Sequence, residues 1–153
     1  MVARCKPENA QGRPVPPQWV VGGVDLQTGK FFLEMVPERS VARLTPVLQR
    51  HILPGSTVWT DCWHGYCQVA QQGYHHEVVN HNENFVDPTT GVHTDNVKSR
   101  WAACKAMLKH CFSVHHQYLP DYLDEHVWRS RHLHNGMIIF HHIIAAICVQ
   151  YPL

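Results

Sequence analysis

The sequence has almost no net charge, because 12 aspartates and glutamates balance its 13 lysines and arginines. The resulting formal charge of +1 excludes a strong overall positive field as the basis for binding nucleic acid. Any basic surface must therefore be local. The 14 histidines could shift this balance, since their protonation below about pH 6.5 would make the chain strongly cationic.

The sequence also lacks a secretory leader and an apolar run long enough to cross a bilayer. Its first residues, Met1 to Pro7, are polar, so we expect the six cysteines to be reduced thiols. The last apolar run, residues 137–149, is interrupted by His141 and His142 and is too short to span a membrane. These features predict an intracellular protein without a membrane partner, located in the nucleus if its source is eukaryotic.

No Cys-x-x-Cys pair occurs, so a strong sequence signal for zinc is missing. Zinc ligands could come from either of two groups, Cys62, His64 and Cys67, or Cys104, His110 and Cys111. Because Cys104 and Cys111 fall on the apolar stripe of a predicted helix, free buried thiols are the favoured interpretation.

A hydrophobic content of 44% over 153 residues is enough for one domain with a core. Residues 19–24 and 31–36 read as two strands of a hairpin, with Gly29 supplying the positive φ of its turn. A helix is expected to follow Ser40 as its N-cap, and Pro46 should kink or interrupt it. The next predicted elements are a strand ending at Asp61, a short helix at 66–71, a strand at 76–80, and helices at about 96–112, 119–131 and 137–151.

This order of elements predicts an α/β fold with a mixed sheet, because the first two strands form a hairpin. The helix at 96–112 has the clearest period, with a core stripe of Val97, Trp101, Cys104, Leu108 and Cys111. Asp95 is its expected N-cap. The apolar final helix is expected to pack against the sheet or a partner.

The stretch from Thr57 to Trp101 organises the chain chemically. It places Asp61 at the end of a strand and a helix start at Asp95, the arrangement of a two-metal nuclease or transposase site. Such a site needs acids from several elements, since two hard divalent cations require several oxygen ligands. Most of those acids are missing here.

Several ordered motifs closely resemble DDE transposases of the Merlin superfamily and their bacterial insertion-sequence relatives, which contain an ISXO-like transposase domain. The resemblance covers nearly the whole chain. Its motifs are residues 19–24, 32–40, 53–57, 60–63, 79–81, 84–88, 90–94, 101–105 and 123–129.

The resemblance implies an RNase H-like core in which three acids hold two Mg²⁺ or Mn²⁺ ions that cut and join DNA. Asp61 matches the second acid. The first acid would lie on a strand before Trp19, so that central strand and the DNA-binding segment ahead of it are expected to be missing. The third acid belongs in a pattern that reads here from His93 to Trp101, where Lys98 takes its place.

We therefore expect a truncated, degenerate domain that is catalytically inactive and holds no cofactor, with Asp61 as a remnant metal ligand. One hypothesis places the Lys98 ammonium near Asp61 in the metal's electrostatic place; the alternative has Lys98 facing solvent. Without the first strand, either the strand at Trp19 pairs directly with the strand at Thr57, or the sheet carries a gap.

The predicted organisation is a lead-in at residues 1–18, the transposase domain at 19–135 and an apolar helix at 136–153. DNA is the expected partner, bound weakly through a basic face, and a second copy of the chain is left open. Two alternatives remain: an active DDE transposase whose upstream part is missing from the gene model, or a domesticated DNA- or protein-binding module. The expected DNA contacts are Lys98, Arg100, Lys105 and Lys109.

Overall fold

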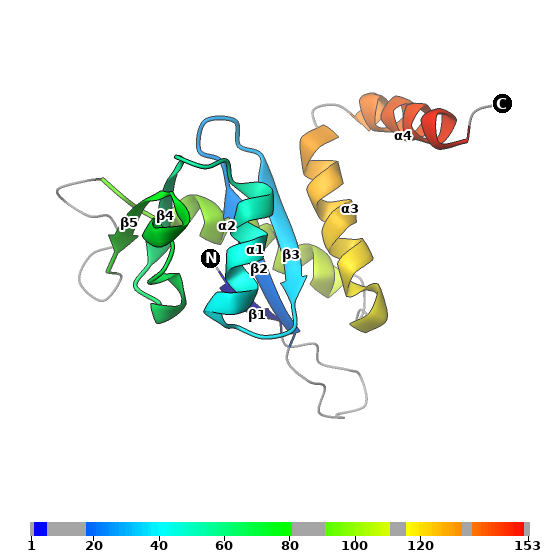
Figure 1. The fold of residues 1–153 in the computed structure, drawn as a ribbon. Helices are drawn as coiled ribbons and strands as arrows, with labels where there is room; N and C mark the ends of the chain where they lie inside the picture. Colours follow the sequence, from blue (N-terminus) through cyan, green and yellow to red (C-terminus); the bar gives the residue numbers. More distant parts are fainter. Residues whose placement is uncertain (1, 6–17, 81–90, 111–115, 133–135, 152–153) are drawn as a thin grey trace.

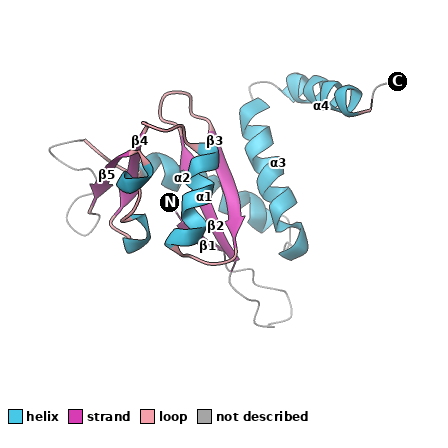
Figure 2. Ribbon diagram, in the orientation of Figure 1, coloured by secondary structure: helices cyan, strands magenta, loops and turns pink. Residues whose placement is uncertain are grey.

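The computed structural model describes residues 2–5, 18–80, 91–110, 116–132 and 136–151. It has a mixed α/β architecture with two small sheets and helices on both faces of the larger one, as Figure 2 shows. The α/β class predicted from the sequence is therefore confirmed. The predicted loop and motif within residues 81–90, and the predicted helix end at residues 111–112, lie outside the described residues.

The larger sheet is antiparallel and has the order β1-β2-β3, formed by Val2–Cys5, Gln18–Val24 and Phe31–Val36. The predicted hairpin between β2 and β3 is confirmed, and Gly29 has a φ of 70° in its turn. Asp25 stabilises this turn by accepting hydrogen bonds from the Gln27 amide at 2.9 Å and the Thr28 hydroxyl at 2.5 Å.

The region expected as a lead-in contains a strand that the sequence analysis missed. β1 pairs antiparallel with β2 along the edge opposite β3, with Val2 opposite Val21 and Cys5 opposite Gln18. The expectation that no strand precedes β2 is therefore wrong. Four residues are too few to display a strand's alternation, so only the pairing with β2 identifies this segment.

The smaller sheet consists of β4, Thr57–Asp61, and β5, His75–Val79, which run parallel. Among the described residues, hydrogen bonds do not join it to the larger sheet, which agrees with the expected gap rather than with direct pairing of β2 and β4. The connection contains the 3-10 turns η1, His64–Tyr66, and η2, Ala70–Gln72, in place of the predicted short helix. It ends at Gly73, whose φ is 87°.

Helix α1, Val41–His51, covers one face of the larger sheet (Figure 1). Its buried side chains Leu44, Val47 and Leu48 pack with Val21 of β2. The predicted interruption at Pro46 does not occur, since the helix continues through it. A proline in a helix removes one backbone hydrogen bond, and here the buried residues on either side hold the helix in place.

Helices α2, Asp95–His110, and α3, Leu119–His132, pack on the other face through Val20 of β2. The predicted stripe of α2 is confirmed where it is described, because Trp101 and Cys104 are buried and Val97 and Leu108 pack beside them. Adjacent residues of β2 point to opposite faces, so Val20 and Val21 enter two separate cores. The 3-10 turn η3, His116–Tyr118, leads into α3.

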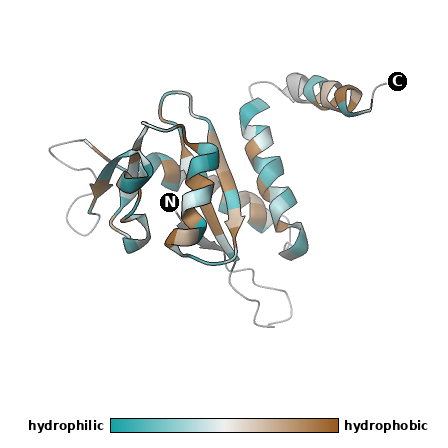
Figure 3. Ribbon diagram, viewed as in Figure 1, coloured by the Kyte–Doolittle hydropathy of each residue, from teal (hydrophilic) through white to brown (hydrophobic). Residues whose placement is uncertain are grey.

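Helix α4, Gly136–Gln150, lies beyond the end of α3 in Figure 1, and Figure 3 shows hydrophobic residues along its described part. It meets α3 where the ring of His142 lies 4.7 Å from that of His132. Its apolar side chains are exposed, with Phe140 at 66% and Val149 at 83%, so this helix does not pack against the sheet. The alternative expectation, packing against a partner, stays a prediction. None of the described helices has the length and apolar character needed to span a membrane.

Replacing Leu123 by alanine should lower the free energy of unfolding by about 2–5 kcal/mol, because Leu123 is 1% exposed and its loss leaves a cavity between α3 and the sheet. Denaturant unfolding measures this change. Leu53→Ala is the matched control, because Leu53 is 79% exposed and should change stability by less than about 0.5 kcal/mol. Equal losses in the two variants would contradict the placement of α3.

Candidate functional site

Asp61 ends β4, and hydrogen bonds hold both its side chain and its backbone. Its Oδ1 accepts a hydrogen bond from the Trp63 amide at 3.3 Å. Its carbonyl accepts one from the Thr60 hydroxyl at 3.0 Å, and that hydroxyl lies 2.8 Å from His76 Nε2. Because the hydroxyl donates to the Asp61 carbonyl, it accepts from the Nε2–H of His76. The carboxylate of Asp61 therefore has a fixed place at the end of the strand.

The turn after Asp61 is organised around the indole of Trp63. The guanidinium carbon of Arg39 lies 3.8 Å from the centre of this ring, and Tyr66 meets the ring edge-on at 5.2 Å. Gly65 is required here, because a Cβ at this position would lie 2.0 Å from the indole. Trp63 is partly buried and packs against the core. The sequence patterns gave Arg39 no role.

The structure brings the start of α2 against β4. His93, two residues before the helix, lies with its ring centroid 5.9 Å from that of Trp59. Trp59 and Asp61 are two residues apart on one strand, so their side chains share a face of the small sheet. Thr94 is buried, and its carbonyl accepts a hydrogen bond from the Lys98 amide at 3.1 Å. Asp95, the expected N-cap, is instead the first helical residue.

Lys98 is paired with Asp95 and not with Asp61. Its Nζ lies 3.6 Å from Asp95 Oδ1 across three residues of the same helix. In the described part of the chain, no ion pair joins Lys98 to Asp61, so the hypothesis that placed the ammonium beside Asp61 is wrong. Residues three apart on a helix are surface neighbours, which makes Asp95 the nearer acid. Both side chains are substantially exposed, so the pair contributes little stability.

The described residues do not fit a site for two divalent cations. No three histidine, cysteine, aspartate or glutamate side chains gather as potential ligands anywhere in residues 2–5, 18–80, 91–110, 116–132 and 136–151. Cys62 and Cys67 are exposed and Cys104 is buried, and none of these three residues forms a disulfide. Asp61 alone cannot supply the several oxygens that two hard cations need.

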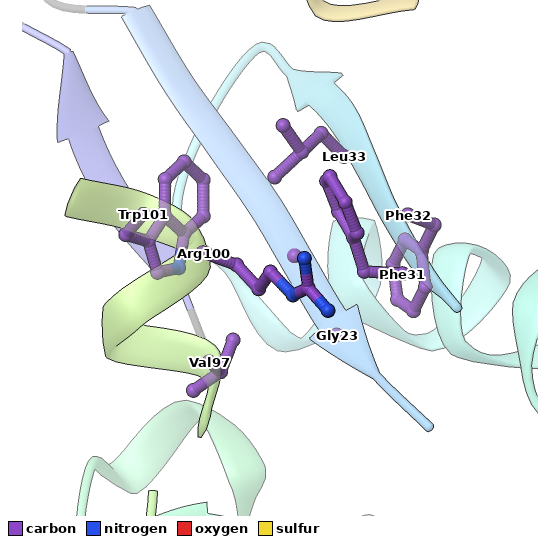
Figure 4. Close-up of a pocket in the computed structure, with 8 residues that line it drawn as sticks. Gly23, Phe31, Phe32, Leu33, Val97, Arg100 and Trp101 are labelled. Carbon is purple, nitrogen blue, oxygen red and sulfur yellow. The ribbon is translucent and has the colours of Figure 1, made fainter. Parts of the chain in front are cut away.

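Arg100 belongs to the hairpin rather than to an open basic surface. Its Nη2 donates to the Gly29 carbonyl at 3.3 Å, and its guanidinium carbon lies 5.2 Å from the centre of the Phe31 ring. Figure 4 shows Arg100 and Trp101 beside a shallow groove at the hairpin end of the sheet, which is too tight to admit water. The groove offers no space for a ligand.

The other basic residues of α2 form a line. Lys105 and Lys109 follow Lys98 by seven and eleven residues, so the three side chains lie along one strip of the helix. Lys105 and Lys109 are exposed. Neither forms an ion pair with another described residue. We call these three residues the lysine strip; it can attract phosphate groups, whereas Arg100 is occupied elsewhere.

The pKa values of two half-buried histidines are lowered. Burial lowers the pKa of His76 in β5, where its ring contacts Thr60. Burial also lowers the pKa of His126 in α3, and the nearby positive charge of Arg100 lowers it further. Both rings therefore favour their neutral form in the folded chain.

The family model described as the ISXO2-like transposase domain matches residues 6–131 of this chain. An uncharacterized transposase-like protein of Haemophilus influenzae is 24% identical over 100 residues, which cover 65% of this chain and 80% of that protein. The family match includes the turn between β3 and α1, strand β4 and helix α2, which carry Arg39, Asp61 and Lys98.

The free energy of unfolding should fall as the pH drops below about 6.5. The pKa of His76 is lower in the folded chain than in the unfolded chain, so the unfolded chain binds a proton that the folded chain does not. Above that pH both states are neutral at this residue and its effect disappears. In His76→Gln, the loss of unfolding free energy between pH 7.5 and 5.5, measured by urea unfolding, should be smaller than in the unchanged chain.

His75→Gln is the matched control, since His75 is the exposed neighbour of His76 in β5. It should leave the pH dependence nearly as it is. Identical pH profiles for His76→Gln and the unchanged chain would show that burial of this ring does not couple folding to protonation.

Proposed function

The chain belongs to the ISXO2-like transposase domain family, and from this premise we propose that it is a transposase-derived domain that has lost DNA cleavage and joining. Asp61 is the remaining acid of the ancestral set, and Lys98 occupies the position of the third acid. The closer relation to the Merlin superfamily is part of the same proposal.

The observation that carries the proposal is the charge at position 98. An active site of this class uses metal ions to neutralise charge on both the attacking and the leaving oxygen. A lysine ammonium at a ligand position repels those ions and supplies no oxygen. Its pairing with Asp95 at 3.6 Å also occupies the nearest acid of the helix. Phosphoryl transfer at Asp61 thus lacks its metals.

The strand order supports an RNase H-like ancestry. The antiparallel order β1-β2-β3, the helix α1 after β3 and the parallel strands β4 and β5 follow the sequence of elements that such a core requires. In that arrangement β1 takes the place of the central strand, between β2 and β4. Among the described residues, no hydrogen bonds join β1 to β4, so the proposed ancestral sheet is interrupted between these two strands.

A second function, binding DNA without chemistry, is favoured by the lysine strip. Three ammonium groups along one side of α2 can follow phosphates of a nucleic-acid backbone, and two of them have no acidic partner in the described part of the chain. Contacts of this kind depend on charge rather than on base sequence, so the binding should be salt-sensitive and largely non-specific.

Supercoiled plasmid incubated with the protein and Mn²⁺ should remain uncut, because the described part of the chain supplies no ligand set for the metals. Gel electrophoresis measures the nicked fraction. Asp61→Asn should behave like the unchanged chain, as should Asp124→Asn, which alters an exposed acid on α3. Metal-dependent nicking that disappears in Asp61→Asn but persists in Asp124→Asn would overturn the inactive assignment.

Exchanging Lys105 and Lys109 together for alanine should weaken binding to a labelled DNA duplex and reduce the slope of log affinity against log salt by about 2. Fluorescence anisotropy at several salt concentrations measures both. The variant Lys30→Ala with Arg43→Ala removes the same charge at exposed positions on other elements. If both double variants lose affinity equally, the binding reflects net charge and not the lysine strip.

A further inference from the structure

We propose that Arg39 is a phosphate contact of this domain, held against Trp63 so that its guanidinium engages a nucleic-acid backbone beside Asp61. This inference rests on the proposed DNA binding and assigns it a second contact, on a different element from the lysine strip. The residue stands between β3 and α1, in the motif Pro37-Glu38-Arg39-Ser40.

Stacking holds the guanidinium of Arg39 in place. Its central carbon lies 3.8 Å from the ring centre of Trp63 and 5.8 Å from that of Trp19. Arginine's planar guanidinium can stack on an indole while its donor edge stays in a fixed orientation. The edge contact with Tyr66 and the lack of a side chain at Gly65 fix the indole itself. The cation is therefore pre-organised before any ligand arrives.

Arg39 differs from the other arginines whose side chains the structure describes. Each of those donates to, or pairs with, an oxygen of the protein, whereas no described oxygen accepts from Arg39. The other pairs are Arg43 with Glu38, Arg50 with Glu34, Arg100 with the Gly29 carbonyl, Arg129 with Glu125, and Arg131 with the Phe31 carbonyl.

The closest acid in sequence is occupied by other groups. Glu38 Oε1 accepts a hydrogen bond from the Ser40 hydroxyl at 3.1 Å and lies 3.5 Å from Arg43 Nε. Asp61 accepts a hydrogen bond from the amide of Trp63. Neither carboxylate pairs with Arg39 in the described structure, so its positive charge is left for a ligand.

The donors of Arg39 define what that ligand is. Its Nε is buried and has no hydrogen-bond partner among the described residues, so an incoming group must reach the guanidinium through its two Nη atoms. Two parallel N–H groups match two oxygens of a phosphate, and such charge-assisted pairs are stronger than neutral hydrogen bonds. The charge also offsets the repulsion that Asp61 would exert on a phosphate bound nearby. A phosphodiester of DNA meets these conditions.

Arg39→Gln in the full chain should weaken binding of a fluorescein-labelled DNA duplex by about tenfold and reduce the salt slope by about 1. Arg43→Gln is the matched control. It removes the same charge four residues away, from a side chain already paired with Glu38, and should weaken binding by less than about twofold. Arg39→Lys keeps the charge but loses the planar fork, so its affinity should fall between the two.

Thermal unfolding of each variant establishes that it is folded before its affinity is compared. If Arg39→Gln does not fold, the comparison passes to Arg39→Lys, whose affinity should lie at least about threefold below that of Arg43→Gln. Equal affinities of the folded Arg39 and Arg43 variants would overturn the inference. If the unchanged chain binds no DNA at all, both the proposed DNA binding and this inference are refuted. If instead only the lysine-strip variant loses affinity, this inference alone is refuted.

Discussion

A positive charge at position 98 is the constraint from which the functional account follows. Two unit charges about 4 Å apart in a partly solvated site interact by about 4 kcal/mol, attractive or repulsive according to sign. Exchanging an acidic ligand for lysine therefore turns a large attraction for a cation into a repulsion, and the loss of ligand oxygens adds to this. The pairing of Lys98 with Asp95 keeps the ammonium on the first turn of α2.

Packing on both faces of the larger sheet fixes the segments that carry the proposed site. Alternate residues of β2 enter two cores, and these cores fix α1 on one face and α2 with α3 on the other. The core with α1 positions Arg39, and the core with α2 and α3 positions Lys98. Asp61 is held by the Trp63 amide at the end of β4. The same packing thus positions basic side chains, and under the proposed function these side chains contact phosphate.

Local patterns predicted the parts of this fold that depend on neighbours in sequence. The β2–β3 hairpin followed from its apolar runs and Gly29, and the core stripe of α2 followed from its spacing. The predicted interruption at Pro46 does not occur because burial around it outweighs one lost hydrogen bond, and the predicted kink stays a prediction. β1 was missed because only its pairing with β2 defines it. The stack of Arg39 on Trp63 joins residues far apart in the chain, and no spacing could have revealed it.

The loss of metal binding can be measured as the affinity of Asp61 for Mn²⁺. Titration calorimetry compares the unchanged chain with Asp61→Asn and Lys98→Glu. Mn²⁺ binding to the many histidines is common to all three, so only the binding that depends on Asp61 reports on this site. The unchanged chain should bind Mn²⁺ no better than Asp61→Asn. Lys98→Glu should bind Mn²⁺ more tightly than the unchanged chain, and adding Asp61→Asn to Lys98→Glu should abolish this gain. Two Mn²⁺ ions that bind to the unchanged chain and are lost in Asp61→Asn would contradict the proposed loss of the metal site.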